Sequence, residues 1–185
     1  MSKAALRKEL VKMSQEQLVT LILDLYSARP QAKEYFEFFL SPDEKELYDK
    51  YVKIVEKEVY RSKRGMLCAR ISYLNAYIKD FASFGVSASA VIDLTLHIAR
   101  IIVFLERAYY MTDALHNSGG KLIVAALARA NDAGLFKETM QRVENLLAIP
   151  QVRPGYAHEI KEQIADYLMA VSYTHLRAHE TLANL

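Results

Sequence analysis

Apolar residues recur every three or four positions along most of this chain, which is the spacing of amphipathic helices. Leu18, Leu21 and Leu25 show this spacing near the N-terminus, and Ile160 and Ile164 show it near the other end. No stretch of useful length alternates apolar and polar residues as a half-buried strand does. The pattern therefore predicts an all-α protein.

The longest apolar segment runs from residue 86 to residue 115 and contains neither proline nor glycine. Its middle is apolar on nearly every side of a helix, which indicates a helix packed on several sides. Charged residues interrupt it before it reaches the roughly 20 apolar residues of a membrane span, namely Asp93, Arg100, Glu106 and Arg107. We predict eight or nine helices, packed as a globular bundle or as stacked helical hairpins around this central helix.

Residues that favour helix ends divide the first sixty positions into four helices. Ser2 precedes the first helix, and Ser14 with Gln17 has the spacing of a capping box before the second. Pro30 opens the third. The run Ser41-Pro42-Asp43-Glu44 supplies a serine cap, a proline at the first helical position and acids in the first turn, so a long fourth helix should follow.

The third of these helices carries a stripe of large apolar side chains, Tyr35, Phe36, Phe39 and Leu40. Aromatic residues at such spacing could form a cage around a ligand. Because the spacing is that of an amphipathic helix, we interpret the stripe as a contact with the protein core.

Length and composition indicate one soluble domain. The chain has 185 residues, a formal net charge of +2 and a single cysteine, Cys68. One cysteine excludes an internal disulfide framework, and the N-terminus lacks the apolar segment of a secretion signal. We therefore expect residues 1–170 to form a single all-helical domain of a cytoplasmic protein.

Ordered short motifs give the chain a family resemblance over more than half its length. They are Ser2-Lys3, Leu6-Arg7-Lys8-Glu9-Leu10, Ser14-Gln15-Glu16-Gln17-Leu18, Leu23-Asp24-Leu25-Tyr26, Ala32-Lys33-Glu34-Tyr35-Phe36, Leu40-Ser41-Pro42-Asp43-Glu44, Arg70-Ile71-Ser72, Phe81 and Gly85-Val86. In this order they resemble a bacterial, all-helical family known as domain of unknown function 6155. The resemblance implies a fold class, and it implies no activity, cofactor or site residue.

A basic loop follows the fourth helix and is the clearest local excess of charge. Arg61, Lys63 and Arg64 lie in it, and Arg70 lies just beyond it on what we expect to be the next helix. These four side chains could contact nucleic-acid phosphates. We interpret them mainly as a solvated charge cluster, because the whole chain is nearly neutral and nucleic-acid-binding domains usually show a broader basic surface.

Residues with chemical potential are otherwise scattered. His97 lies between Leu96 and Ile98 on the most apolar segment, and we predict a neutral, hydrogen-bonded core histidine. The glycines at positions 119 and 120 predict a flexible turn over residues 116–120. The sequence shows no catalytic, metal or cofactor motif, so we expect no enzyme activity and no cofactor.

The last fifteen residues, 171–185, resemble a translated sequencing-library adapter and not a selected protein segment. His175 and His179 stand four residues apart, as metal ligands on a helix do, but an adapter origin removes their significance. The native chain would then continue differently after residue 170. We therefore expect the apolar face of Tyr156, Ile160, Ile164 and Tyr167 to lack a packing partner.

These observations leave the function open. The preferred interpretation is a non-enzymatic, helical protein-interaction module that binds a partner protein or a second copy of itself. We do not expect it to bind a membrane. The alternative is a weak nucleic-acid-associated protein that uses residues 61–70. An enzyme is the third possibility, although no pair of acidic residues is placed by the sequence as a catalytic acid and base.

Overall fold

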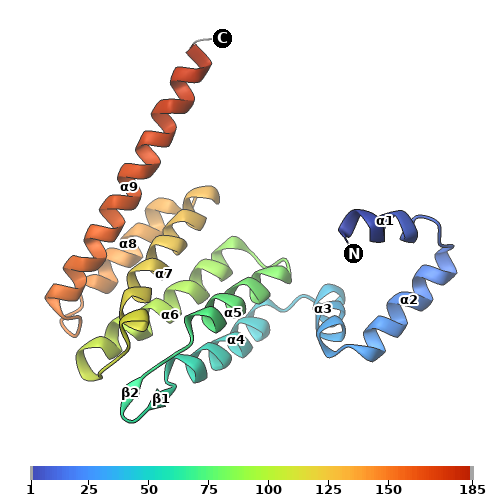
Figure 1. The fold of residues 1–185 in the computed structure, drawn as a ribbon, viewed down its shortest axis with the longest axis horizontal. Helices are drawn as coiled ribbons and strands as arrows, with labels where there is room; N and C mark the ends of the chain where they lie inside the picture. Colours follow the sequence, from blue (N-terminus) through green and yellow to red (C-terminus); the bar gives the residue numbers. More distant parts are fainter. Residues whose placement is uncertain (1, 184–185) are drawn as a thin grey trace. The chain divides into compact units, whose positions relative to one another are not determined.

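A computed structural model describes the backbone of residues 2–183 and the side chains of residues 2–171. The protein is all-α, as predicted, apart from one small hairpin (Figure 1). The elements are α1 (Lys3–Leu10), α2 (Gln15–Ala28), α3 (Pro30–Leu40), α4 (Glu44–Val59), β1 (Ser62–Lys63), β2 (Met66–Leu67), α5 (Ile71–Ser83), α6 (Ala88–Ala108), α7 (Asp113–Asp132), α8 (Phe136–Leu147) and α9 (Pro154–Ala183).

Contacts divide the chain into two compact units, Met1–Asp43 and Glu44–Leu185. From the sequence we expected one domain over residues 1–170. The difference arises because every buried apolar side chain among the described residues belongs to position 47 or beyond. We call residues 1–43 the N-terminal unit and residues 44–171 the helical stack.

The N-terminal unit forms the helices that its sequence predicts. The Ser2 hydroxyl caps α1, Ser14 and Gln17 form the capping box of α2, and Pro30 occupies the first turn of α3. None of the three helices has a buried residue. The apolar stripe of α3 is therefore not the core contact that we predicted: Phe39 is 67% exposed and Leu40 is 79% exposed.

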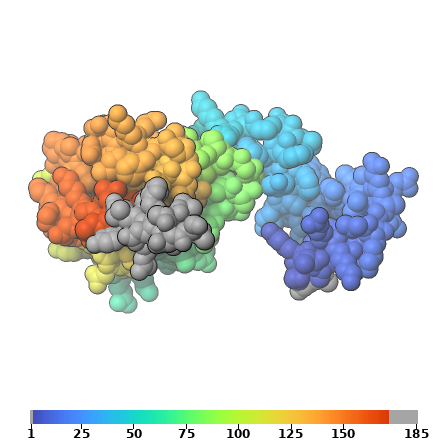
Figure 2. All heavy atoms as spheres, turned by 90° about the horizontal axis from the view of Figure 1, so that it is seen from above, coloured from blue at the N-terminus to red at the C-terminus, as the bar shows by residue number. Residues whose placement is uncertain are grey.

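The helical stack is built from helical hairpins. α4 packs against α5, and α6 packs most extensively against α7. The first hairpin contacts the second through α4 and α6, and both α8 and α9 pack on α7. In the space-filling view, the atoms coloured green through orange lie together in one body (Figure 2). Of the two predicted arrangements, the contacts match packed helical hairpins.

The start of α4 differs from the prediction by a few residues and connects two hairpins. The helix begins at Glu44, whereas the sequence favoured a cap at Ser41. One carboxylate oxygen of Glu44 accepts the backbone N–H of Ser87 at 2.7 Å, and the other accepts the Ser87 hydroxyl at 2.9 Å. Ser87 is in turn the N-cap of α6. The acid thus fixes the start of the central helix.

The central helix is shorter than predicted. α6 ends at Ala108, and α7 begins after an N-cap at Thr112, so residues 86–115 do not form one helix. The backbone between them is extended because β2 pairs with it: the Leu67 N–H donates to the Tyr110 carbonyl, and the Leu67 carbonyl accepts the Thr112 N–H. Backbone hydrogen bonds to β2 therefore replace a continuation of the helix.

Within the shorter limits, α6 is the buried centre of the stack. Ten of its residues are buried, from Val91 to Val103. Among the described residues, α6 is also the one helix whose length and hydropathy would suit a membrane span. More than half of that apolar window is buried inside the stack, so packing against α4 and α7 accounts for its composition.

Residues 116–120 are helical, in contrast to the flexible turn that we predicted. They lie within α7, and Ser118, Gly119 and Gly120 are all buried. A β-carbon at Gly119 would collide with the Tyr156 hydroxyl, and one at Gly120 would collide with the Gln163 side chain. Gly119 thus allows Tyr156 of α9 to approach α7 closely, whereas the flexible end of Gln163 could shift to make room at Gly120. The packing of α9 on α7 outweighs the low helix propensity of the glycines, about 1 kcal/mol each.

The prediction that the apolar face of the last helix, α9, lacks a packing partner is wrong. Tyr156, Ile160 and Ile164 are 1%, 0% and 4% exposed, because α9 packs on α7. Exposure increases only near Leu168 and Met169. The helix continues to Ala183, but the side chains of residues 172–185 lie outside the described residues, so the adapter interpretation of 171–185 and its His175/His179 pair stays a prediction.

Candidate functional site

The predicted basic loop is a small β-hairpin. Ser62 pairs with Leu67 and Lys63 pairs with Met66. Arg64 and Gly65 form the turn with φ angles of 55° and 79°, as a two-residue turn that follows strand twist requires. These strands were not predicted from the sequence, because two residues are too few to show an alternation of apolar and polar positions. The glycine at the turn was the available signal.

Arg70, one of the four basic residues, is engaged within the protein. It precedes α5 as its N-cap residue. Its Nε lies 3.0 Å and its Nη2 2.6 Å from the two carboxylate oxygens of Glu58, whose side chain is 6% exposed. The backbone N–H of Arg70 also donates to Glu58, and the guanidinium lies 3.7 Å from the centre of the Tyr73 ring. The side-chain hydrogen bond from Arg70 lowers the pKa of Glu58, and the same pairing raises the pKa of Arg70.

Arg61 also has a hydrogen-bond partner within the protein, because its Nη1 donates to the Cys68 carbonyl at 2.8 Å. Cys68 itself lies between β2 and α5. Lys63 and Arg64 belong to the hairpin, and among the described residues their side chains have no hydrogen-bond or ion-pair partner. The structure thus divides the four predicted phosphate-contacting residues into two that brace the hairpin base and two at its tip.

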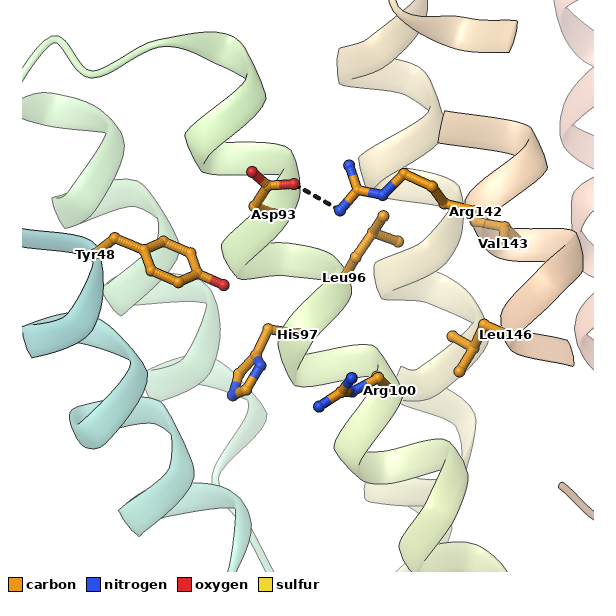
Figure 3. Close-up of a pocket in the computed structure, with 8 residues that line it drawn as sticks. All are labelled: Tyr48, Asp93, Leu96, His97, Arg100, Arg142, Val143 and Leu146. Atoms are coloured by element: carbon orange, nitrogen blue, oxygen red, sulfur yellow. Dashed lines mark hydrogen bonds and ion pairs between the residues drawn. The ribbon is translucent and has the colours of Figure 1, made fainter. Parts of the chain in front are cut away.

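A different cluster forms the most promising site. A cavity of about 500 Å³ opens between α4, α6 and α8 (Figure 3). α4 contributes Tyr48. The remaining lining residues are Asp93, Leu96, His97 and Arg100 on α6 and Arg142, Val143 and Leu146 on α8. The four α6 residues share one face because they are spaced by three and four positions. We call this cavity the α4–α6–α8 pocket.

One ion pair crosses the mouth of the pocket. Nη2 of Arg142 lies 2.6 Å from Oδ1 of Asp93, and the two side chains are 40% and 39% exposed. Such exposed pairs contribute at most about 1 kcal/mol. Their main consequence here is geometric, because the pair connects α8 to α6 and leaves Arg142 with a neutralising partner.

His97 lies in this pocket and not in an enclosed core, which corrects our prediction. Its Nε2 is 3.0 Å from a carboxylate oxygen of Glu56 on α4, and its side chain is 17% exposed. The expected hydrogen bond is present. The core position is not confirmed, since the polar side chains of Asp93, Arg100 and Arg142 line the same cavity as His97.

Two polar groups of the pocket have no hydrogen-bond or ion-pair partner in the described part of the chain. One is the guanidinium of Arg100, whose described contact is the face of Phe104 at 6.0 Å. The other is the hydroxyl of Tyr48, whose ring packs edge-on against Phe81. Burial and then the nearby charge of Asp93 raise the pKa of Tyr48. The hydroxyl therefore keeps its proton at neutral pH.

The lining of the pocket combines polar and apolar side chains. The pocket offers cationic and hydroxyl donors above the buried side chains of Leu96, Val143 and Leu146. Across the part of the chain that the structure describes, no three His, Cys, Asp or Glu side chains are grouped as metal ligands. The pocket was not predicted from the sequence, although polar residues at positions 93, 97 and 100 on an otherwise apolar helix were a detectable signal.

Comparison with known proteins gives one match. The model of a family of unknown function, DUF6155, matches residues 1–146, which include the N-terminal unit and the stack through most of α8. No curated protein and no solved structure matches the chain. The resemblance seen in the sequence is thereby confirmed as to family and all-helical fold.

Proposed function

Since the chain belongs to the DUF6155 family, which carries no assigned activity, we propose its role from the structure: a non-enzymatic protein-interaction module of the cytoplasm. The α4–α6–α8 pocket is its binding surface. Packed helical hairpins present side chains from successive helices on a common surface, which is how helical repeat proteins bind their partners.

The observation that carries this proposal is the unpaired polar lining of the pocket. Arg100 and Tyr48 have donors without described partners, and they lie beside an apolar floor. Protein interfaces combine these features, with arginine and tyrosine enriched at their centres. His97 is hydrogen-bonded to Glu56, and this proposal assigns it no catalytic role.

The nucleic-acid alternative has less support than its sequence suggested. Arg61 and Arg70 are held by Cys68 and Glu58, so two basic residues remain at the hairpin tip. Two phosphate contacts predict a slope of about −1.8 for log affinity against log salt on duplex DNA, compared with about −3.6 for four. Binding of that kind would be weak at physiological salt.

Site-specific photo-crosslinking in the native host tests the proposal. A photoreactive amino acid replaces Asn145, which is exposed on α8 between Arg142 and Leu146. Matched controls replace Lys79 on α5 and Lys121 on α7, which are exposed and outside the pocket. We expect one crosslinked protein at position 145 that is absent at 79 and 121, and that binds the purified chain. Equal crosslinking at all three positions, or none at 145, would contradict the proposal.

A further inference from the structure

We propose that the α4–α6–α8 pocket binds a single carboxylate group, supplied by an acidic side chain of the partner protein. Arg100 provides the cation and Tyr48 a neutral hydrogen-bond donor. The inference rests on the proposed function and specifies the chemistry by which the partner is recognised.

Charge balance in the pocket is the first support. Two arginines and one aspartate line it, so the lining carries one more positive than negative charge. Asp93 neutralises Arg142 at 2.6 Å. The excess charge therefore belongs to Arg100, which has no carboxylate partner among the described residues. An arginine without a counter-ion beside a partly covered cavity attracts an anion and can bind a carboxylate through two parallel hydrogen bonds.

The direction of the donors is the second support. Figure 3 shows the Tyr48 ring reaching from α4 toward α6, on the same side of α6 as His97 and Arg100. The Tyr48 hydroxyl stays protonated, because burial raises its pKa, and it has no described acceptor. His97 is not counted as a donor, since Glu56 holds its Nε2.

The remaining lining distinguishes among anions. A phosphate dianion would bring two negative charges next to Asp93, whereas the lining offers one excess positive charge. The buried side chains of Leu96, Val143 and Leu146 form an apolar floor that suits the aliphatic stem of a glutamate-like group. A monoanionic carboxylate on an apolar stem satisfies both features.

NMR titration of the full chain provides the test, with 4-methylpentanoate as the probe. This molecule has one carboxylate and a branched apolar stem. Its neutral counterpart, 4-methylpentanamide, and inorganic phosphate are titrated in parallel. We expect 4-methylpentanoate to shift the side-chain Nε–H signal of Arg100 with a dissociation constant in the millimolar range, and we expect the amide to leave that signal unchanged.

Three variants locate the effect. Arg100→Gln removes the cation and should weaken the binding of 4-methylpentanoate at least about tenfold, since charge-assisted hydrogen bonds are stronger than neutral ones. Tyr48→Phe removes only the hydroxyl and should weaken the binding of 4-methylpentanoate about three- to fivefold. Arg129→Gln is the matched control, because Arg129 is exposed on α7 and outside the pocket, and it should change nothing. Circular dichroism confirms that each variant is folded, and Tyr48→Phe supplies the second reading if Arg100→Gln unfolds.

The outcomes separate this inference from the proposed function. No shift at Arg100, equal binding of the amide, binding that survives Arg100→Gln, or phosphate binding tighter than 4-methylpentanoate would each overturn the carboxylate assignment. Crosslinking at position 145 would still support a protein-binding surface in those cases. Loss of position-specific crosslinking with retained 4-methylpentanoate binding would instead assign the pocket to a free small carboxylate and contradict the partner protein as its source.

Discussion

The N-terminal unit and the helical stack have equally clear helix signals and different amounts of core. α2 has a complete capping box and an apolar face, yet none of its side chains is buried. α6 has an N-cap of the same type and buries ten residues. The comparison shows that capping and periodicity determine where a helix forms, while burial depends on whether neighbouring helices enclose its apolar face.

The same contrast appears in how the helix ends are held. The cap of α2 is local, because Ser14 and Gln17 satisfy each other three residues apart. The cap of α6 is both local and long-range, since Glu44 reaches Ser87 across 43 positions. Long-range partners of this kind connect elements of the stack. Within the N-terminal unit, one hydrogen bond between α2 and α3 joins Tyr26 to Glu37 near the surface.

The largest expected effect comes from a matched pair of phenylalanine truncations. Phe81→Ala removes a fully buried ring on α5 and should cost about 3–5 kcal/mol of unfolding free energy. Phe39→Ala removes a ring that is 67% exposed on α3 and should cost less than about 0.5 kcal/mol. Urea unfolding of both variants measures the difference. Similar losses for the two would break the distinction between the units.

Glu58→Gln tests an ion pair that belongs to the stack alone. At pH 7 the variant loses charge-assisted hydrogen bonds with Arg70, so we expect a loss of about 1.5–3 kcal/mol of unfolding free energy. The folded-state pKa of Glu58 is lowered, so its contribution is fully present above the unfolded pKa of about 4.3 and is lost as pH falls through the folded pKa. The difference in unfolding free energy between wild type and variant should therefore decrease progressively below about pH 4. A gap of constant size from pH 7 to pH 3 would show that the charge is not responsible.

Deletion of residues 1–43 should have a small effect on the stack. All buried apolar side chains of the described chain come from position 47 onward, so the stack retains its own core. We expect its thermal midpoint to change by less than about 3 °C, equivalent to under about 1 kcal/mol in a domain of this size. Differential scanning calorimetry of the full chain and of the chain without residues 1–43 measures the two midpoints. A fall of about 10 °C or more would show that the stack depends on the deleted helices.

The smallest effect is expected from Ser14→Ala. Loss of the capping box weakens α2 by about 1 kcal/mol, which reduces local helicity. Because α2 has no buried residue, the thermal midpoint of the stack should not change measurably. Amide signals of residues 15–20 report the local loss by NMR, and calorimetry reports the midpoint. A lowered midpoint would imply that α2 and the stack unfold together.

Local sequence signals predicted the helices well and their packing less well. Ser2, Ser14 and Pro30 begin helices where expected, because their interactions lie within one turn. The errors at α6 and α7 have non-local causes. β2 interrupts the predicted central helix by pairing with Tyr110 and Thr112. Gly119 lies within α7 because the packing of Tyr156 against it requires a residue without a side chain at that position, so this glycine does not mark a turn.

The candidate site was predictable only in part, for the same reason. The charges of Arg61 and Arg70 were visible in the sequence, but their partners Cys68 and Glu58 depend on the hairpin geometry. The α4–α6–α8 pocket could be anticipated on α6, where the polar positions share a face. Its other wall, with Arg142, comes from a helix 49 positions away and required the folded structure.

Amide hydrogen exchange of the full chain, followed by mass spectrometry, tests the contrast between the two units most directly. Exchange reports the free energy of local opening along the backbone. Peptides from α6 and α7 should exchange slowest, with protection close to that of global unfolding. Peptides from α2 and α3 should exchange many orders of magnitude faster, since no buried side chain resists their opening. Protection in α2 and α3 equal to that in α6 would contradict the account.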